Sequence, residues 1–118
     1  MKWLTFILLV LSFPALAAEK DYQDAWCPTV NGKPTTLRDR LTGEVVGYVD
    51  CLTPTHAVEV DPGKKWAEGL GQALFYASRT GRRAGVLLIT PAGSRHHRRL
   101  QAIIEHYGLP VDVWTIDP

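Results

Sequence analysis

Long apolar runs are scarce in this 118-residue chain, and the one that exists lies at its start. The stretch from Trp3 to Val10 follows Lys2 and precedes Ala15-Leu16-Ala17, a small-residue cleavage pattern. This order is typical of a secretory signal peptide, and the stretch is too short to span a bilayer comfortably. We therefore predict a leader at residues 1–17 and export to the periplasm or the cell exterior. An uncleaved anchor is the alternative.

Cysteine is equally scarce, because Cys27 and Cys51 are the only two in the chain. No CxxC or HxxxH spacing accompanies them, so a zinc site lacks its usual ligand pattern. Export places both thiols in an oxidising compartment, where a disulfide between them is the natural outcome. Closing this loop stabilises a fold by about 3 kcal/mol in the chain-entropy model.

Several familiar signatures are also missing. The chain has no serine elbow, no glycine-rich phosphate loop and no haem motif. It has no linker, repeat or low-complexity tract either, so residues 18–118 are expected to form one domain of ordinary size. Without Lys2 the basic and acidic side chains balance at 12 each, so net charge predicts no partner.

The distribution of charge is more informative than its sum. Residues 77–118 carry six arginines and only three acids. Such a patch either attracts a polyanion such as nucleic acid or simply solvates a surface. The six candidates for nucleic-acid binding are Arg79, Arg82, Arg83, Arg95, Arg98 and Arg99.

The first half of the mature chain predicts a helix followed by three strands. Alternating apolar residues and turn chemistry indicate these elements. The predicted helix includes Asp21 to Trp26, the hairpin strands are Thr35 to Leu41 and Glu44 to Cys51, and the third strand is Ala57 to Asp61.

The second half alternates helices with buried strands. Pro62 opens a helix that ends near Thr80, where Gly81 follows, and its apolar positions recur at helical spacing. The apolar run at 84–89 is typical of a parallel strand buried on both faces. Ser94 caps a second helix, and residues 111–116 form the last strand.

These elements predict an α/β fold of order αβββαβαβ, with helices flanking a central mixed sheet. The sheet combines an antiparallel hairpin region with a parallel strand. Three motifs fall on it: Gly47-x-x-Asp50, Glu59-x-Asp61, and Gln72-x-x-x-Tyr76 on the helix after the strands. In this order they resemble the PD-(D/E)XK nuclease-like superfamily, especially its branch with a glutamine and a tyrosine in that helix. The resemblance covers residues 21–90 and implies a restriction-endonuclease-like fold.

The resemblance implies a metal-dependent site that acts on phosphodiester bonds. Asp50 matches the first metal-binding acid and Glu59 the second, and the carbonyl of Val60 is a further ligand. Oxygen ligands of this kind suit Mg²⁺ or Mn²⁺, which polarise a phosphodiester and lower the pKa of an attacking water. Gln72 and Tyr76 then position the phosphate or the water.

One position departs from the superfamily pattern, because Asp61 stands where the usual lysine would be. Lys64 or Lys65 is the candidate replacement, and we favour Lys65 because it shares a helix stripe with Gln72 and Tyr76. Asp61 is either a third metal ligand or the N-cap of the helix that Pro62 opens. An acid from the N-terminal helix is a further candidate for the site, and the choice among Glu19, Asp21 and Asp24 stays open.

The predicted site requires the two acids to converge. Side chains alternate along a strand, so Asp50 and Glu59 share a face if Asp50 lies opposite Ala57. A two-residue Thr53-Pro54 loop or a four-residue loop produces that register, whereas a three-residue loop without a bulge separates the acids.

Three functions remain open from the sequence. The first is an exported nuclease of DNA or RNA that depends on a divalent metal. The second is a nuclease-like fold without catalysis, used as a secreted binding module. The third is a disulfide-stabilised envelope protein, in which the acids bond backbone amides and Gln72 and Tyr76 are packing residues.

Overall fold

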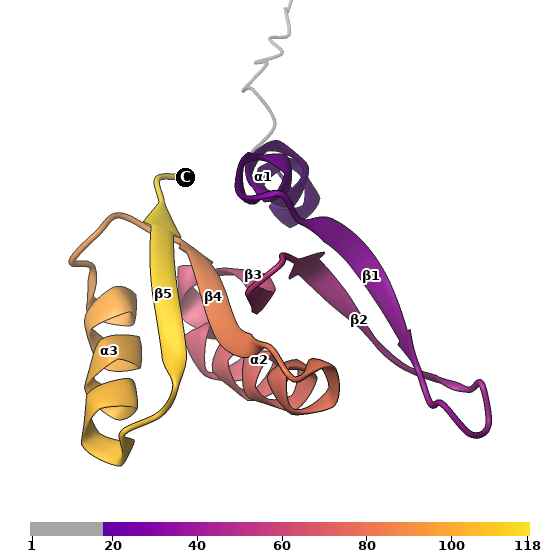
Figure 1. The fold of residues 1–118 in the computed structure, drawn as a ribbon. Coiled ribbons are helices and arrows are strands. Elements are labelled where there is room, and N and C mark those ends of the chain that lie inside the picture. The colour runs from indigo at the N-terminus through magenta and orange to yellow at the C-terminus, as the bar shows by residue number, and fades with distance from the viewer. Residues whose placement is uncertain (1–17) are drawn as a thin grey trace, which may run out of the picture.

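The computed structural model describes residues 18–118, and the predicted leader lies outside them. The elements follow the predicted order and confirm the α/β class (Figure 1). They are α1 (Glu19–Trp26), the 3-10 turn η1 (Cys27–Val30), β1 (Lys33–Arg38), β2 (Val45–Leu52), β3 (His56–Pro62), the 3-10 turn η2 (Gly63–Lys65), α2 (Trp66–Thr80), β4 (Arg83–Ile89), α3 (Arg95–Tyr107) and β5 (Val111–Ile116).

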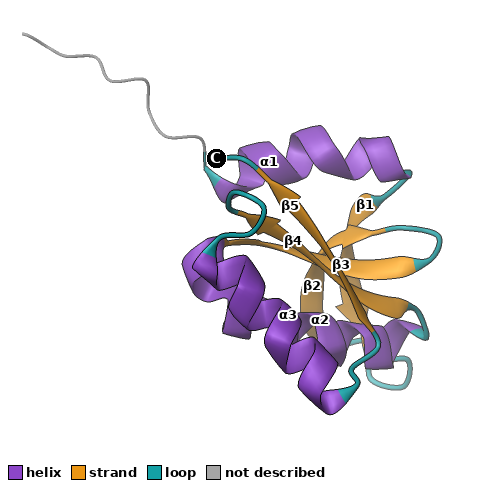
Figure 2. Cartoon of the chain, turned by 90° about the vertical axis from the view of Figure 1, so that its left-hand side faces the viewer, coloured by secondary structure: helices purple, strands orange, loops and turns teal. Residues whose placement is uncertain are grey.

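The five strands form one mixed sheet in the order β1-β2-β3-β4-β5. The first three pair antiparallel, and β3, β4 and β5 pair parallel. Figure 2 shows α1 on one face of the sheet and α2 with α3 on the other. No helix among residues 18–118 is both long and apolar enough to cross a membrane.

Two apolar cores fill the spaces between the sheet and its helices. Leu70 of α2 and Leu100 of α3 pack with the buried residues Val86 and Leu88 on one face. On the other face, the core beneath α1 includes Leu87, which alternates with these two residues along β4. Burial of β4 on both faces explains its unbroken apolar sequence.

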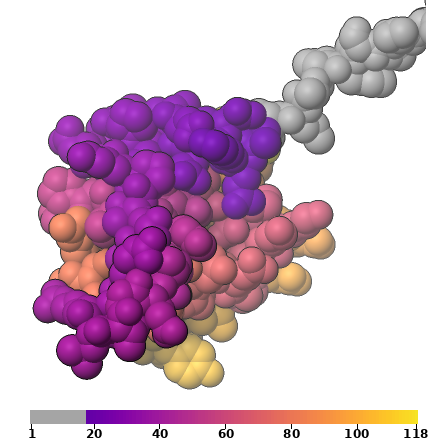
Figure 3. All heavy atoms as spheres, turned by 90° about the vertical axis from the view of Figure 1, so that its right-hand side faces the viewer, coloured from indigo at the N-terminus to yellow at the C-terminus, as the bar shows by residue number. Residues whose placement is uncertain are grey.

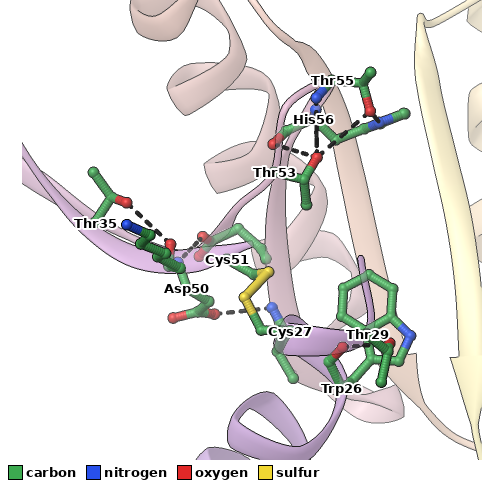
Figure 4. Close-up of a disulfide and its surroundings, with 12 residues drawn as sticks. Trp26, Cys27, Thr29, Thr35, Asp50, Cys51, Thr53, Thr55 and His56 are labelled. Carbon is green, nitrogen blue, oxygen red and sulfur yellow. Dashed lines mark hydrogen bonds between the residues drawn. A yellow bond between two sulfur atoms is a disulfide. The ribbon is translucent and has the colours of Figure 1, made fainter. Parts of the chain in front are cut away.

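The Cys27–Cys51 disulfide is present and joins η1 to β2. Both cysteines are buried in the core beneath α1, and their Cα atoms lie 5.7 Å apart. Asp50 immediately precedes Cys51 in β2, and Figure 4 shows it beside the disulfide. The disulfide therefore anchors the strand that carries the first predicted acid.

Neither of the two loops favoured from the sequence joins β2 to β3. The Thr53 amide donates to the His56 carbonyl at 2.9 Å, so the two turn residues are Pro54 and Thr55. Cys51 then pairs with Val58, which moves the register by two residues from the predicted one. A shift of two preserves which side chains share a face, and it brings Asp50 beside Glu59, whose Oε2 accepts the Asp50 amide.

Candidate functional site

The acids of β2 and β3 lie where the two strands separate. Regular pairing stops after Cys51 and Val58, and the β1–β2 hairpin diverges from β3 beyond that point (Figure 1). Side chains replace the missing backbone bonds. The Asp50 amide donates to Glu59 Oε2 at 3.2 Å, and the Val60 amide donates to Asp50 Oδ2 at 2.8 Å.

The remaining oxygen of each carboxylate, Asp50 Oδ1 and Glu59 Oε1, makes no hydrogen bond within residues 18–118. Neither oxygen is among the fully buried, unbonded atoms of the described residues, so both remain accessible. Carboxylates whose second oxygen is available are ligands that hard divalent cations prefer. Each carboxylate thus bonds a backbone amide of the neighbouring strand, as the envelope-protein alternative expects, and the two acids lie close enough for the charge of Asp50 to raise the pKa of Glu59.

A β-bulge brings Asp50 into this position. Between Leu52 and Val49, β2 advances three residues while β1 advances two, from Lys33 to Thr35. Asp50 and Cys51 of β2 therefore lie together opposite the single residue Pro34 of β1. Bulges bend a strand and re-aim a side chain, and they are frequent beside functional sites.

Asp61 does not cap the helix after β3, so the N-cap interpretation is wrong. It lies within β3 and pairs with Leu88 of β4. No side chain caps either η2 or α2. The carboxylate instead lies against Gly69 of α2, where an added Cβ would be 2.6 Å from Asp61 Oδ2.

Asp61 and Glu59 are both buried, with only 4% and 2% of each residue's surface exposed. Asp61 Oδ2 is a buried oxygen without a hydrogen-bond partner in the described chain. Burial, followed by the charge of Asp50, raises the pKa of Glu59 to about 8. Burial, followed by the charges of Glu19 and Asp50, raises the pKa of Asp61 to about 7. Burial and the neighbouring acids therefore favour the neutral form of both acids, and a cation bound beside them would favour the charged form.

Of the three candidate acids of α1, Glu19 is the one whose charge raises the pKa of Glu59 and Asp61, although it is exposed. Its pKa is raised by burial and then by the charge of Asp50. Asp21 instead accepts a hydrogen bond from the Ala18 amide at 2.9 Å, and Asp24 forms an ion pair with Lys20. The sequence contained this signal, since Asp24 follows Lys20 by four residues, the spacing of helical ion pairs.

Lys65 is a cation close enough to affect two of these acids. Its charge lowers the pKa of Asp61 and of Glu19, opposing the effects of burial on both. Lys65 ends η2, immediately before α2, and is exposed. The structure also adds Glu68, which raises the pKa of Asp61 and Glu19 and was not among the predicted residues.

Tyr76 joins α2 to the hairpin. The Tyr48 amide donates to its hydroxyl at 3.4 Å, and its ring fills the space where a side chain at Gly47 would lie. Gly47 is therefore required by this close approach. Gln72 lies exposed one turn before Tyr76 on the same stripe of α2.

The six predicted arginines do not share one surface. Arg82, just before β4, donates to the Thr53 carbonyl, and Arg83, the first residue of β4, pairs with Asp112 at 2.6 Å. The other end of β4, about 20 Å away at about 3.3 Å per residue, leads to α3. That helix carries Arg95, Arg98 and Arg99, whereas Arg79 lies on α2.

No three or more His, Cys, Asp or Glu side chains in the described part of the chain are placed to hold a metal ion as a group. Asp50, Glu59 and Asp61 therefore do not form a ready three-carboxylate centre.

No family model, curated protein or solved structure is significantly similar to this chain.

Proposed function

We propose that the protein is an exported nuclease that uses a divalent cation to hydrolyse phosphodiester bonds of DNA or RNA. The topology around the acids supports this, because two carboxylates meet where β2 leaves β3 and α2 closes the same space. The proposal includes the PD-(D/E)XK, restriction-endonuclease-like identity inferred from the motifs. Export to the periplasm or beyond belongs to it as well, and the disulfide is compatible with that compartment.

One observation carries the proposal: Glu59 and Asp61 are buried acids beside the half-buried Asp50, and Asp61 Oδ2 lacks a partner within residues 18–118. Buried carboxylates without a compensating charge are costly. A bound cation removes this cost. Mg²⁺ commonly uses only one or two protein carboxylates together with waters and substrate phosphates, so a three-ligand centre is not required.

Asp50 and Glu59 are the proposed ligands, through the oxygens that the backbone bonds leave available, with the Val60 carbonyl as a third donor. A Mg²⁺ or Mn²⁺ ion held there supplies Lewis acidity toward a phosphodiester. Asp61 adds negative charge to the cation site. Lys65 contributes positive charge toward the transferring phosphate, in place of the lysine that Asp61 displaces. Gln72 and Tyr76 orient the phosphate from α2.

The test begins with calorimetric titration of the mature protein with Mn²⁺ and Mg²⁺. We expect binding that is lost in Asp50→Asn and in Glu59→Gln. Asp24→Asn is the control, because Asp24 is exposed and pairs with Lys20. Cation affinity unchanged in both site variants would overturn the proposed ligands.

Cleavage is then measured on labelled single- and double-stranded DNA and RNA. We expect turnover that requires Mg²⁺ or Mn²⁺ and falls by about 100-fold or more in Lys65→Ala, the scale for losing one positioned electrostatic group. Lys64→Ala is the matched control on the adjacent exposed position. Equal loss in both variants would show that Lys65 has no special role.

A second candidate is a catalytically inactive fold that binds partners in the same compartment. It is favoured by Asp61 at the lysine position and by the absence of a three-residue metal group in residues 18–118. This candidate predicts no cleavage of any nucleic acid with either metal. Turnover abolished by Lys65→Ala would eliminate it.

A further inference from the structure

A groove lies between the far end of the β1–β2 hairpin and the second half of α2. Of the predicted site residues, only Arg79 lines it. Its volume is about 270 Å³. Figure 3 views the molecule from the side on which the magenta hairpin projects. The lining combines arginines with apolar side chains: Leu37, Arg38, Asp39, Arg40, Leu41, Val46, Ser78 and Arg79.

The hairpin side of this groove is held by a network of hydrogen bonds. Asp39 Oδ1 accepts from the amides of Leu41 and Thr42 at 2.8 and 2.9 Å. The Gly43 amide donates to the Asp39 carbonyl at 2.9 Å, and Arg38 donates to the Gly43 carbonyl. These bonds fix a turn in which Leu41 is 95% exposed to solvent. An apolar side chain held in water by an ordered turn is available for contact with a ligand.

Positive charge dominates the polar part of the groove. Arg38 and Arg40 come from the hairpin and Arg79 from α2, and they oppose one carboxylate, that of Asp39. Asp39 lies 4.0 Å from Arg79, and its backbone amide bonds are the main cause of its lowered pKa. Since those amides already stabilise the Asp39 charge, the groove keeps an excess of guanidinium groups. Guanidinium groups bind phosphate with two parallel hydrogen bonds.

The groove lies at a defined distance from the candidate acids. Gly69 contacts Asp61, and Arg79 lies ten residues further along α2. Ten helical residues span about 15 Å. A stacked nucleic-acid strand advances about 3.4 Å per nucleotide, so this distance corresponds to about four nucleotides.

We infer that the groove is a subsite for one nucleotide of a polynucleotide, about four nucleotides from the bond at the acid site. Arg40 and Arg79 bind its phosphate, and Leu37, Leu41 and Val46 contact its sugar and base. The inference rests on the proposed function for the identity of the ligand. It makes the protein selective for strands longer than a few nucleotides.

The test measures binding without cleavage. The mature protein, with Ca²⁺ in place of Mg²⁺, is titrated into fluorescent oligothymidylates from the dinucleotide to the dodecanucleotide, and anisotropy is followed at several salt concentrations. We expect affinity to rise stepwise beyond about four nucleotides. In the double variant Arg40→Ala, Arg79→Ala the step disappears, and the salt slope for the long strands falls by about one for each phosphate that the variant no longer binds.

Lys33→Ala is the matched control, since Lys33 is an exposed cation of the same hairpin that does not line the groove. A double variant with lysine at both positions retains charge without the bidentate geometry, and it is expected to restore part of the step. Far-UV circular dichroism verifies that each variant is folded.

The outcomes separate this inference from the proposed nuclease activity. A length step that depends on Arg40 and Arg79, in a protein that never cleaves with Mg²⁺ or Mn²⁺, supports the subsite and overturns the nuclease. Cleavage with no length step, or a step that survives in the double alanine variant, overturns the subsite alone. A protein that binds none of the oligonucleotides overturns the subsite as well.

Discussion

Asp50 and Glu59 hold β2 to β3 through a carboxylate at the point where regular strand pairing ends, because Glu59 Oε2 accepts the Asp50 amide at 3.2 Å. A neutral amide oxygen can accept the same hydrogen bond, whereas alanine leaves the Asp50 amide without it. We therefore expect Glu59→Gln to retain the stability of the metal-free protein. Glu59→Ala should lower it by about 1–3 kcal/mol, the cost of an unsatisfied buried donor.

Urea unfolding of the two Glu59 variants and the wild type measures this difference. The matched comparison separates the structural bond from the charge, since both variants remove the charge and only alanine removes the acceptor. Equal stability of the two variants would show that the bond contributes nothing.

Stability of the metal-free protein is expected to fall as pH rises from about 4 to about 8. The folded-state pKa values of Glu59 and Asp61, about 8 and about 7, lie above the ordinary 4.5 and 3.8. A raised pKa means that the folded state favours the neutral acid. This stabilisation is complete below the ordinary pKa and is lost as pH rises through the folded-state value.

Unfolding midpoints between about pH 4 and about pH 8 measure this trend. Saturating Mn²⁺ should raise the midpoint most at the upper end, where both acids are charged and bind the cation best. In Asp61→Asn the decline with pH should be shallower. A metal-free protein whose stability increases over this range would contradict the assignment of buried, uncompensated acids.

Loss of the disulfide should weaken both the fold and the site. A Cys27→Ala, Cys51→Ala double variant loses a link across 24 residues, which costs about 3 kcal/mol in the chain-entropy model. Because Cys51 adjoins Asp50 in the bulge of β2, cation affinity should fall as well. Urea unfolding and Mn²⁺ calorimetry measure the two effects. Cation affinity equal to that of the wild type would show that the bulge holds Asp50 without the bridge.

The elements are predictable wherever the local pattern matches the final packing. The sequence of residues 84–89 predicts a strand buried on both faces, and β4 occupies that place because helices cover both sides of the sheet. The predicted cap Ser94 is confirmed, since its side chain accepts the His97 amide at 3.2 Å. Signals of this kind lie within a few residues of one another, so one sequence suffices to find them.

Asp61 shows what a local pattern misses. Asp61-Pro62 is typical of a helix start, yet Asp61 stays in β3 because seven consecutive pairs with β4 extend the strand to Pro62. That pairing depends on residues more than 20 positions away. The bulge at Asp50 and the separation of the six arginines onto different surfaces were missed for the same reason. Both depend on how strands and helices that are distant in the sequence pack together.

The two glycines of α2 provide a matched test of the site. Gly69 lies against Asp61, and an added Cβ would be 2.6 Å from Asp61 Oδ2, whereas a Cβ at Gly71 would meet nothing within 4 Å. Both lie inside the helix, so alanine at either position gains up to about 1 kcal/mol of helix propensity. Gly71→Ala should therefore stabilise the protein and leave cation binding unchanged. Gly69→Ala should displace the Asp61 carboxylate, lose that stabilisation and bind Mn²⁺ at least about tenfold more weakly, a difference of about 1.4 kcal/mol. Unfolding and calorimetry of the two variants side by side measure both effects, and wild-type Mn²⁺ affinity in Gly69→Ala would show that Asp61 takes no part in the cation site.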